Sequence, residues 1–502
     1  MNLSPSHANR WLSLFLCAHL LLWTLAPALL RYNLPLDAIE GTIWGHQLEW
    51  GYDKNPFLNG WLTALAVYFD RYSGWVIYLF SQICVVTGLW AVWRLAREML
   101  TPAHALISVM LLEGIQYYNF HAIDFNDNTL ELCLWPLAVY YFYRALRSSG
   151  YMPWLLTGVF AGLGMMAKYY TSTLLAGMGL FLLTHSQHWK HFSRPGPYLG
   201  LTAFLLIILP HGVWLFQHDF ITIHYVIERG RSAPGWINHI LYPAAFTLEQ
   251  LEAFLPALVL YSMLYLGKEN QTPPQQDIIG AFNQAFLFYI GIMPLLLTLM
   301  LSVLFGTKLR AGWGMPLLST WGIILTASLR PALSRKQLYC FIACVFLLMG
   351  VMITGYSIRL LNTSSLASAN YPGQEMARAI TQLWHERYHT RLEYVGGPRW
   401  IGGNIGFYSP DHPAVFVEWN KRRAPWVSLD DLREKGAVFV WDMNQAESVP
   451  EDIRKEFPRL LPPVIKEFVR HRSKNISAPV RIGIAFLPPQ TRADAILPAA
   501  PA

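Results

Sequence analysis

Long apolar runs dominate roughly the first 360 residues of the chain. A helix that spans the hydrocarbon core of a bilayer needs about 20 mostly apolar residues. About eleven runs approach this length, near residues 11–30, 74–93, 103–118, 128–146, 152–167, 171–184, 198–216, 243–266, 279–304, 313–329 and 337–358. They predict a polytopic α-helical membrane protein with about eleven transmembrane helices. The first run also resembles a signal peptide, because Arg10 precedes it and Ala-Pro-Ala follows it, but its length and the later spans favour a retained helix.

The pattern changes in the region 365–490, where long apolar runs stop and charged residues become frequent. Short elements separated by Gly, Pro, Asn and Asp are typical of an α/β domain. The elements that we expect are a helix over Gln374–Tyr388 and strands over Ala414–Glu418, Gly436–Trp441 and Val480–Phe486. A region of this length can bury its own core. We therefore predict a transmembrane module at 1–360, an α/β domain at 365–490 and a disordered Ala/Pro-rich tail at 491–502.

The composition supports a membrane protein. The 502 residues are 54% hydrophobic and only 14% charged, whereas soluble domains carry about 25% charged residues. The net charge of +7 is spread along the chain, so it indicates basic loops at a membrane surface and no nucleic-acid partner. All five cysteines lie in apolar runs, which predicts neither a disulfide framework nor a Cys-x-x-Cys metal pair.

The charges of the short loops predict the orientation. With the N-terminus in the cytoplasm, the inner loops hold roughly eleven Lys and Arg residues against roughly seven outside. With eleven spans, the loop 31–73, the segments 119–127 and 217–242, the turn 305–312 and the C-terminal domain then face outward.

The loop 31–73 is long and acidic in a chain that is poor in acids. Asp37, Glu40 and Trp44 have the i, i+3, i+7 spacing of one helix face. Two carboxylates held together are able to act as a general base or to bind a divalent cation. The alternative is that they are only solvated acids at the membrane boundary.

A second acidic segment contains Asp124 and Asp127, directly before the apolar run that starts at Leu130. Asp127 either caps that helix or joins Asp37 and Glu40 as a catalytic or metal-binding carboxylate, because the predicted topology brings both segments to the outer face. Cations near the same face complete the candidate site: Lys54, Lys168, His218, Lys308 and Arg310. Cations at membrane depth mark functional sites unless they reach the interface by snorkelling. Together with an acid they suit a phosphate-bearing substrate.

Several segments resemble the membrane glycosyltransferases of the GT-C fold, and most of all bacterial glycosyltransferase family 39. This family is related to protein O-mannosyltransferases and to the aminoarabinose and galacturonic acid transferases that modify lipopolysaccharide. The matching segments are Asp37–Trp44, Gly51–Leu58, Asn126–Leu130, Gly162–Tyr169, Pro210–Phe220, Tyr371–Gly373 and Phe407–Pro410. The family's adjacent Asp-Glu pair is split here, because Ile39 takes the Asp position before Glu40, and Asp37 stands two residues earlier. Lys54-Asn55 replaces the Asp-His of the family, and is similar to the Lys-Pro-Pro of the aminoarabinose transferases.

The resemblance implies transfer of a sugar from a polyprenyl-phosphate donor to lipid A or lipopolysaccharide, a glycan or a protein at the periplasmic face of the inner membrane. An acid (Asp37, Glu40 or Asp127) would take the acceptor proton, and the five cations would hold the donor phosphate. It implies no nucleotide cofactor, and leaves open a divalent cation held by these acids. The rival hypothesis is a secondary transporter or lipid flippase, which would place ionisable residues in broken helices within paired repeats. No such repeat is visible in the sequence, and the nucleotide-binding motif GxxxxGK[ST] is absent as well.

Overall fold

The computed structural model describes residues 3–231, 235–265, 279–331, 333–362, 368–472 and 479–490. The predicted disordered tail at 491–502 therefore lies outside the described residues. The chain forms two compact units. The helical unit comprises Met1–Ala26, Lys54–Leu58 and Tyr78–Gly355, and the α/β unit comprises Pro27–Asp53, Asn59–Ile77 and Tyr356–Ala502.

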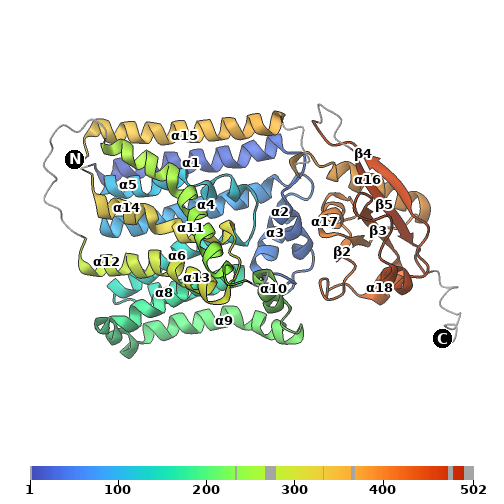
Figure 1. Cartoon of the computed structure of the whole chain (residues 1–502), viewed down its shortest axis with the longest axis horizontal. Helices are drawn as coiled ribbons and strands as arrows, with labels where there is room; N and C mark the ends of the chain where they lie inside the picture. Colours follow the sequence, from blue (N-terminus) through green and yellow to red (C-terminus); the bar gives the residue numbers. More distant parts are fainter. Residues whose placement is uncertain are drawn as a thin grey trace. The chain divides into compact units, whose positions relative to one another are not determined.

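The helical unit is a bundle of long and short helices (Figure 1). Its helices are α1 (Pro5–Leu30), α4 (Trp75–Met99), α5 (Pro102–Met110), α6 (Asp127–Arg147), α7 (Met152–Ala167), α8 (Thr171–Thr184), α9 (Pro195–Gln217), α10 (Ile221–Gly230), α11 (Asn238–Ser262), α12 (Ala281–Leu287), α13 (Met293–Phe305), α14 (Trp321–Leu329) and α15 (Arg335–Asn362). Short 3₁₀ turns extend some of them, among them η1 (Leu111–Gly114), η4 (Ser186–Ser193), η7 (Ala311–Gly314) and η8 (Pro316–Thr320). Each predicted apolar run coincides with one of these helices or with a helix and its adjoining turns.

Membrane-spanning length is reached by six helices among the described residues: α1, α4, α9, α11 with its last turn, α12 with α13, and α15. Shorter apolar helices, including α7 and α8, accompany them. At 1.5 Å per residue, the 16 residues of α7 extend about 24 Å, which is less than the hydrocarbon core of a bilayer. The chain is therefore a multi-pass α-helical protein, and the count of eleven spans stays a prediction.

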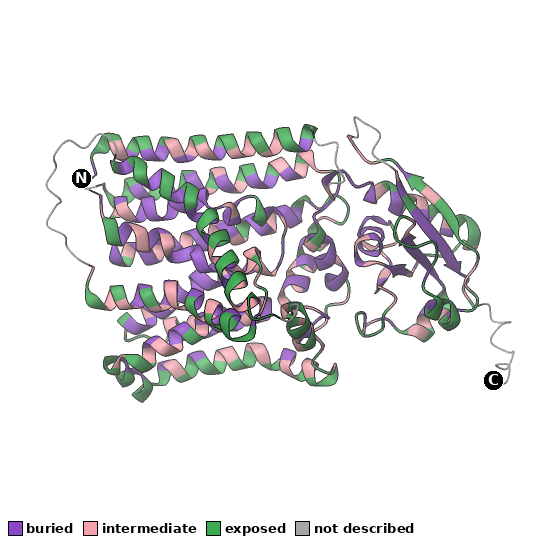
Figure 2. Cartoon of the chain, viewed as in Figure 1, coloured by how far each residue is buried: buried purple, intermediate pink, exposed green. Residues whose placement is uncertain are grey.

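Apolar side chains cover the outer faces of the bundle. Figure 2 shows exposed positions along α9 and α15, and α9 exposes several large residues: Leu201, Leu205, Leu206, Leu209 and Phe216. A continuous apolar surface of this kind is unfavourable in water. Lipid is the solvent that matches it.

Small residues bring α7 and α9 into backbone contact. A Cβ added to Gly158 would lie 1.9 Å from the carbonyl oxygen of Gly200, and one added to Gly196 would lie 2.4 Å from the Trp154 ring. Helices in lipid gain their contact energy from such close packing, because no hydrophobic effect drives them together. The position of α7, and therefore of Lys168 at its end, depends on these glycines.

The α/β unit contains a five-stranded sheet in the order β2-β1-β3-β5-β4. The strands are β1 (Tyr394–Gly397), β2 (Ala414–Val417), β3 (Ala437–Asp442), β4 (Val464–Phe468) and β5 (Val480–Leu487). Strand β1 pairs in parallel with β2 and β3, and β5 runs antiparallel to β3 and β4. The other elements are the helices α2 (Leu36–Gly45), α3 (Leu58–Phe69), α16 (Gly373–Tyr388), α17 (Arg399–Tyr408), α18 (Leu429–Lys435) and α19 (Glu451–Glu456).

Three strands and the helix predicted for this region are confirmed. The pattern did not reveal β1, which has only four residues, or β4, an edge strand whose side chains are largely exposed. Charged residues on an exposed edge prevent pairing with another chain, and Lys466 and Glu467 have this position in β4.

Most of the loop 31–73 belongs to the same compact unit as the C-terminal region. Helix α2 packs on α17, where a Cβ added to Gly403 would lie 2.6 Å from Ile39 and 2.9 Å from Ile43. The main chain N–H of Leu34 donates to the hydroxyl of Tyr408. This arrangement differs from the predicted boundaries, which placed the loop 31–73 in the membrane module. The loop differs from the predicted boundary because the apolar face of α2 is buried on α17.

Candidate functional site

An ion pair joins the start of α6 to the break between α7 and α8. Helix α6 begins with Asn126, whose side chain accepts the N–H of Thr129 at 3.1 Å. The suggestion that Asp127 caps this helix is therefore wrong, because the residue before it does so. Lys168 Nζ lies 3.1 Å from Asp127 Oδ2 and also donates to the side-chain oxygen of Asn128.

The backbone places Lys168 at this position. Helix α7 ends at Ala167, and Lys168 has the extended conformation φ −160°, ψ 136° before α8 starts. Its side chain and that of Asp127 are each 15% exposed, so both are partly desolvated while a path to them remains. The Lys168 ammonium lies 5.9 Å from the centre of the Trp313 ring, and a cation near an aromatic face is attracted to it.

Two further side chains beside Lys168 and Asp127, Glu131 and Trp313, were not predicted from the sequence. Glu131 is fully buried one turn after Asp127, and its Oε1 accepts the hydroxyl of Thr171 at 3.1 Å. The Thr171 hydroxyl in turn accepts the indole N–H of Trp135 at 3.0 Å. The i, i+4 spacing of Asp127 and Glu131 was a signal for Glu131, whereas the approach of Trp313 needs the tertiary structure. We call Asp127, Asn128, Glu131, Lys168 and Trp313 the lysine cluster.

The other predicted cations also belong to the helical unit. Lys54 Nζ is 5.8 Å from the ring of Tyr225 in α10. His218 is half-buried, stacks on Trp214 at 4.1 Å and hydrogen-bonds the Trp214 carbonyl through Nδ1 at 2.8 Å. Lys308 and Arg310 are exposed in the turn before η7, which carries Trp313. Among the predicted residues of this unit, the structure thus brings Asp127 and Lys168 into direct contact.

The remaining predicted acids belong to the α/β unit. Helix α2 forms as expected, with Asp37 half-buried in its first turn. Glu40 is buried, and its Oε1 lies 2.6 Å from Nη1 of Arg399. Nη2 of Arg399 lies 2.6 Å from Asp53 Oδ2. Burial alone would lower the pKa of Arg399, but the carboxylates of Glu40 and Asp53 outweigh it and hold this pKa above its usual value.

The sequence also left these carboxylates open as metal ligands. No group of three or more His, Cys, Asp or Glu side chains with a metal-binding arrangement exists among the described residues. Glu40 is paired with Arg399, and Asp127 with Lys168. Cations at these positions disfavour a second cation, so the residues described do not fit a divalent metal site.

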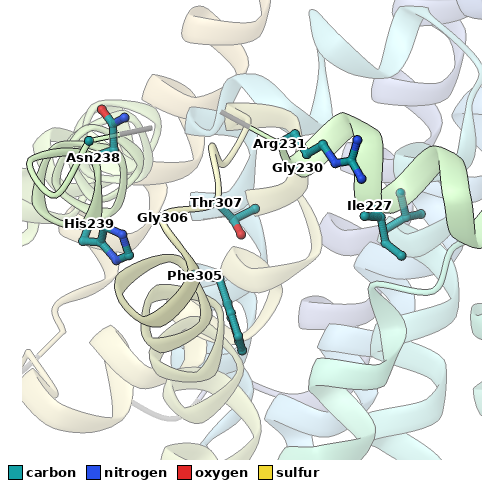
Figure 3. Close-up of a pocket in the computed structure, with 10 residues that line it drawn as sticks. Ile227, Gly230, Arg231, Asn238, His239, Phe305, Gly306 and Thr307 are labelled. Carbon is teal, nitrogen blue, oxygen red and sulfur yellow. The ribbon is translucent and has the colours of Figure 1, made fainter. Parts of the chain in front are cut away.

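A pocket of 560 Å³ lies between the end of α10, the start of α11 and the turn after α13 (Figure 3). In this view Ile227 lies on α10, Arg231 lies directly after α10, and His239 lies on α11, with Thr307 between Arg231 and His239. His239 donates from Nδ1 to the carbonyl of Val303 at 2.6 Å, which leaves Nε2 as an acceptor. Apolar walls with a few polar groups are typical of small-molecule and lipid sites.

Comparison with known proteins gives a consistent result. Residues 54–214 match the family model described as dolichyl-phosphate-mannose-protein mannosyltransferase. The lipopolysaccharide core galacturonosyltransferase RgtA of Rhizobium johnstonii is 24% identical over 467 residues, which are 88% of this chain and 89% of that protein. The undecaprenyl phosphate-α-4-amino-4-deoxy-L-arabinose arabinosyl transferase 1 of Sodalis glossinidius is 24% identical over 239 residues, 44% of this chain and 40% of that protein.

Among solved structures, the chain is similar to ArnT from Cupriavidus metallidurans bound to undecaprenyl phosphate. The TM-score is 0.61 with 12% sequence identity, over 95% of this chain and 98% of that one. The likeness shows that the two chains share a fold, with helices followed by a small sheet-containing region.

Proposed function

We propose that this chain, a membrane glycosyltransferase of the GT-C fold, transfers a sugar from a polyprenyl-phosphate donor to a lipid acceptor, lipid A or lipopolysaccharide, at the periplasmic face of the inner membrane. Glycan and protein acceptors remain alternatives within the same chemistry. The names of the similar proteins support a lipid-phosphate donor and a lipopolysaccharide acceptor. The observation that carries the proposal is the lysine cluster.

The lysine cluster suits the leaving group of such a reaction. Polyprenyl phosphate departs as an anion, and a cation in a partly desolvated site stabilises developing charge far better than one in water. We assign this role to Lys168, with Asp127 and Asn128 holding its ammonium at the break between α7 and α8. Lys54, His218, Lys308 and Arg310 are further candidate phosphate ligands.

We assign the proton transfer to the acidic loop. The acceptor hydroxyl oxygen attacks the anomeric carbon, its proton passes to a carboxylate, and the carbon–oxygen bond to phosphate breaks with its electrons on the phosphate. Glu40 is buried against Arg399, a permanent cation that gives it a structural role. We therefore assign proton acceptance to Asp37, which is half-buried on the same helix. No step needs a nucleotide, because the lipid-linked sugar already carries a good leaving group.

The pocket at Arg231 and His239 suits a lipid-borne substrate. Val226, Ile227 and Phe305 supply apolar surface for hydrocarbon, and Arg231 supplies a cation for an acidic headgroup. Two segments that line this pocket also carry residues next to the candidate phosphate ligands. Helix α10 carries Tyr225 near Lys54, and the turn after α13 leads to Trp313.

A deletion strain of the source organism tests the function. We expect the lipopolysaccharide to lose the mass of a sugar residue, and the wild-type gene to restore it. Lys168→Met and Asp37→Asn should fail to restore it, whereas Lys455→Met, in an exposed ion pair of the α/β unit, should restore it fully. Mass spectrometry of lipid A, core and envelope glycans gives the result.

Two results would contradict the proposal at different levels. Unchanged envelope glycans in the deletion strain would exclude the transfer reaction. Restoration by Asp37→Asn would leave the reaction in place and refute the proposed base.

A further inference from the structure

A buried cluster of three charged residues connects the outer loop to the C-terminal region within the α/β unit. Arg399 contacts Glu40 and Asp53, each at 2.6 Å, and the three side chains are only 9%, 8% and 5% exposed. They come from separate segments, because Arg399 is the first residue of α17, Glu40 lies in α2, and Asp53 follows the stretch after α2. One cation thus holds two carboxylates from the loop.

This cluster is a costly way to hold a fold together. Moving charges out of water costs several kcal/mol per ion, and apolar side chains of similar volume are often at least as stabilising as a buried ion pair. Apolar contacts already seat α2 on α17 through Ile39, Ile43 and Gly403. A guanidinium adds a geometric constraint to these contacts, because its planar fork holds two carboxylates at defined angles.

The two carboxylates stand next to residues of the proposed site. Asp37 precedes Glu40 by three residues on α2, so the two lie on one flank of the helix. Lys54 directly follows Asp53 in the chain. Fixing Glu40 sets the rotation of α2 about its axis, and fixing Asp53 sets the direction in which the backbone leaves toward Lys54.

We propose that Arg399 is a positioning residue of the transferase: through Glu40 and Asp53 it orients the loop segments that carry Asp37 and Lys54. The inference rests on the proposed function. It gives the C-terminal domain a part in the chemical step, separate from any recognition of the acceptor. Arg399 is too buried, and too fully engaged by the two carboxylates, to bind substrate itself.

Kinetics of the purified full-length protein test this role. The donor probes are undecaprenyl-phosphate 4-amino-4-deoxy-L-arabinose and undecaprenyl-phosphate galacturonic acid, with lipid A as acceptor. Arg399→Lys keeps the charge and loses the planar fork, so we expect kcat to fall about 10- to 100-fold, because small misplacements of reacting groups reduce rates by such factors. The donor KM should rise by less than kcat falls, because Lys54 is only one of several candidate ligands of the donor phosphate. Arg423→Met, in an exposed ion pair with Glu418, should keep the wild-type kcat.

A double-mutant cycle separates positioning from an independent role. If Arg399 acts through Glu40, then Glu40→Gln and Arg399→Lys should each lower kcat. The kcat of the double variant should then be no lower than that of the less active single variant. Multiplicative effects would overturn the proposal, as would a wild-type kcat for Arg399→Lys. Loss of folding in Arg399→Lys, seen as a collapsed thermal transition, would also overturn it and assign Arg399 to folding alone. An inactive wild-type protein with both donors would instead count against the proposed function.

Discussion

Replacing Lys168 by Met removes one charge and keeps a side chain of similar length. The ammonium is 15% exposed and lies 3.1 Å from Asp127, so water screens it only partly. For a unit charge about 4 Å from a phosphate oxygen, Coulomb's law gives about 4 kcal/mol at an effective dielectric constant of about 20. Loss of a donor that faces developing negative charge reduces kcat by about 10²- to 10³-fold in well-studied enzymes. We therefore expect a decrease of this size.

The assay is transfer of radiolabelled sugar from polyprenyl phosphate to lipid A by the purified protein in detergent or nanodiscs. Lys168→Arg should keep part of the activity, because it retains the charge. The double variant Lys168→Met/Asp127→Asn also removes the carboxylate that Lys168→Met leaves without its cation. It should therefore be more stable to heat than Lys168→Met, but its kcat should stay low. A kcat for Lys168→Met within about threefold of wild type would refute the electrostatic reasoning.

We expect three further outcomes, two from the structure and one from the topology predicted from the sequence. Gly158→Leu should lower the unfolding temperature, because its side chain would enter the backbone of α9; Gly179→Ala, with open space around it, is the control that should not. Burial lowers the pKa of His46 and His412 below 6.5; the unfolded chain then binds more protons, so stability should fall as pH drops below about 6.5, and His412→Gln should weaken this dependence in thermal melts at pH 7.5 and 5.5. A periplasm-dependent phosphatase fused after Tyr356 should be active, and an inactive fusion would contradict the predicted parity of the spans.

Local patterns explain what could be predicted. Apolar runs located the helices because hydrophobicity and helix formation act over about 20 neighbouring residues. The strands β2, β3 and β5 were recognisable from β-branched and aromatic residues between turn signals. Lys168 was recognisable as a lone cation in an apolar stretch, which is costly unless it has a partner.

Some local details and all pairings between distant segments could not be predicted. The cap of α6 depends on one residue, and the choice between Asn126 and Asp127 is settled by backbone geometry. Two strands were missed because one is short and the other lies at an exposed edge, where no buried face imposes a pattern. Trp313 approaches Lys168 only through the packing of the bundle.

The sequence by itself determined that the helices lie in lipid, and which residue types the candidate site contains. Long apolar runs favour lipid as their surroundings, and the acids and cations at the ends of these runs are local features of the chain. The tertiary structure decided which charges meet. Asp127 pairs with Lys168, and Glu40 pairs with Arg399, a residue more than 300 positions away along the chain. The physical reason is that a buried charge must find a partner, and the packing of helices and strands determines which one is within reach.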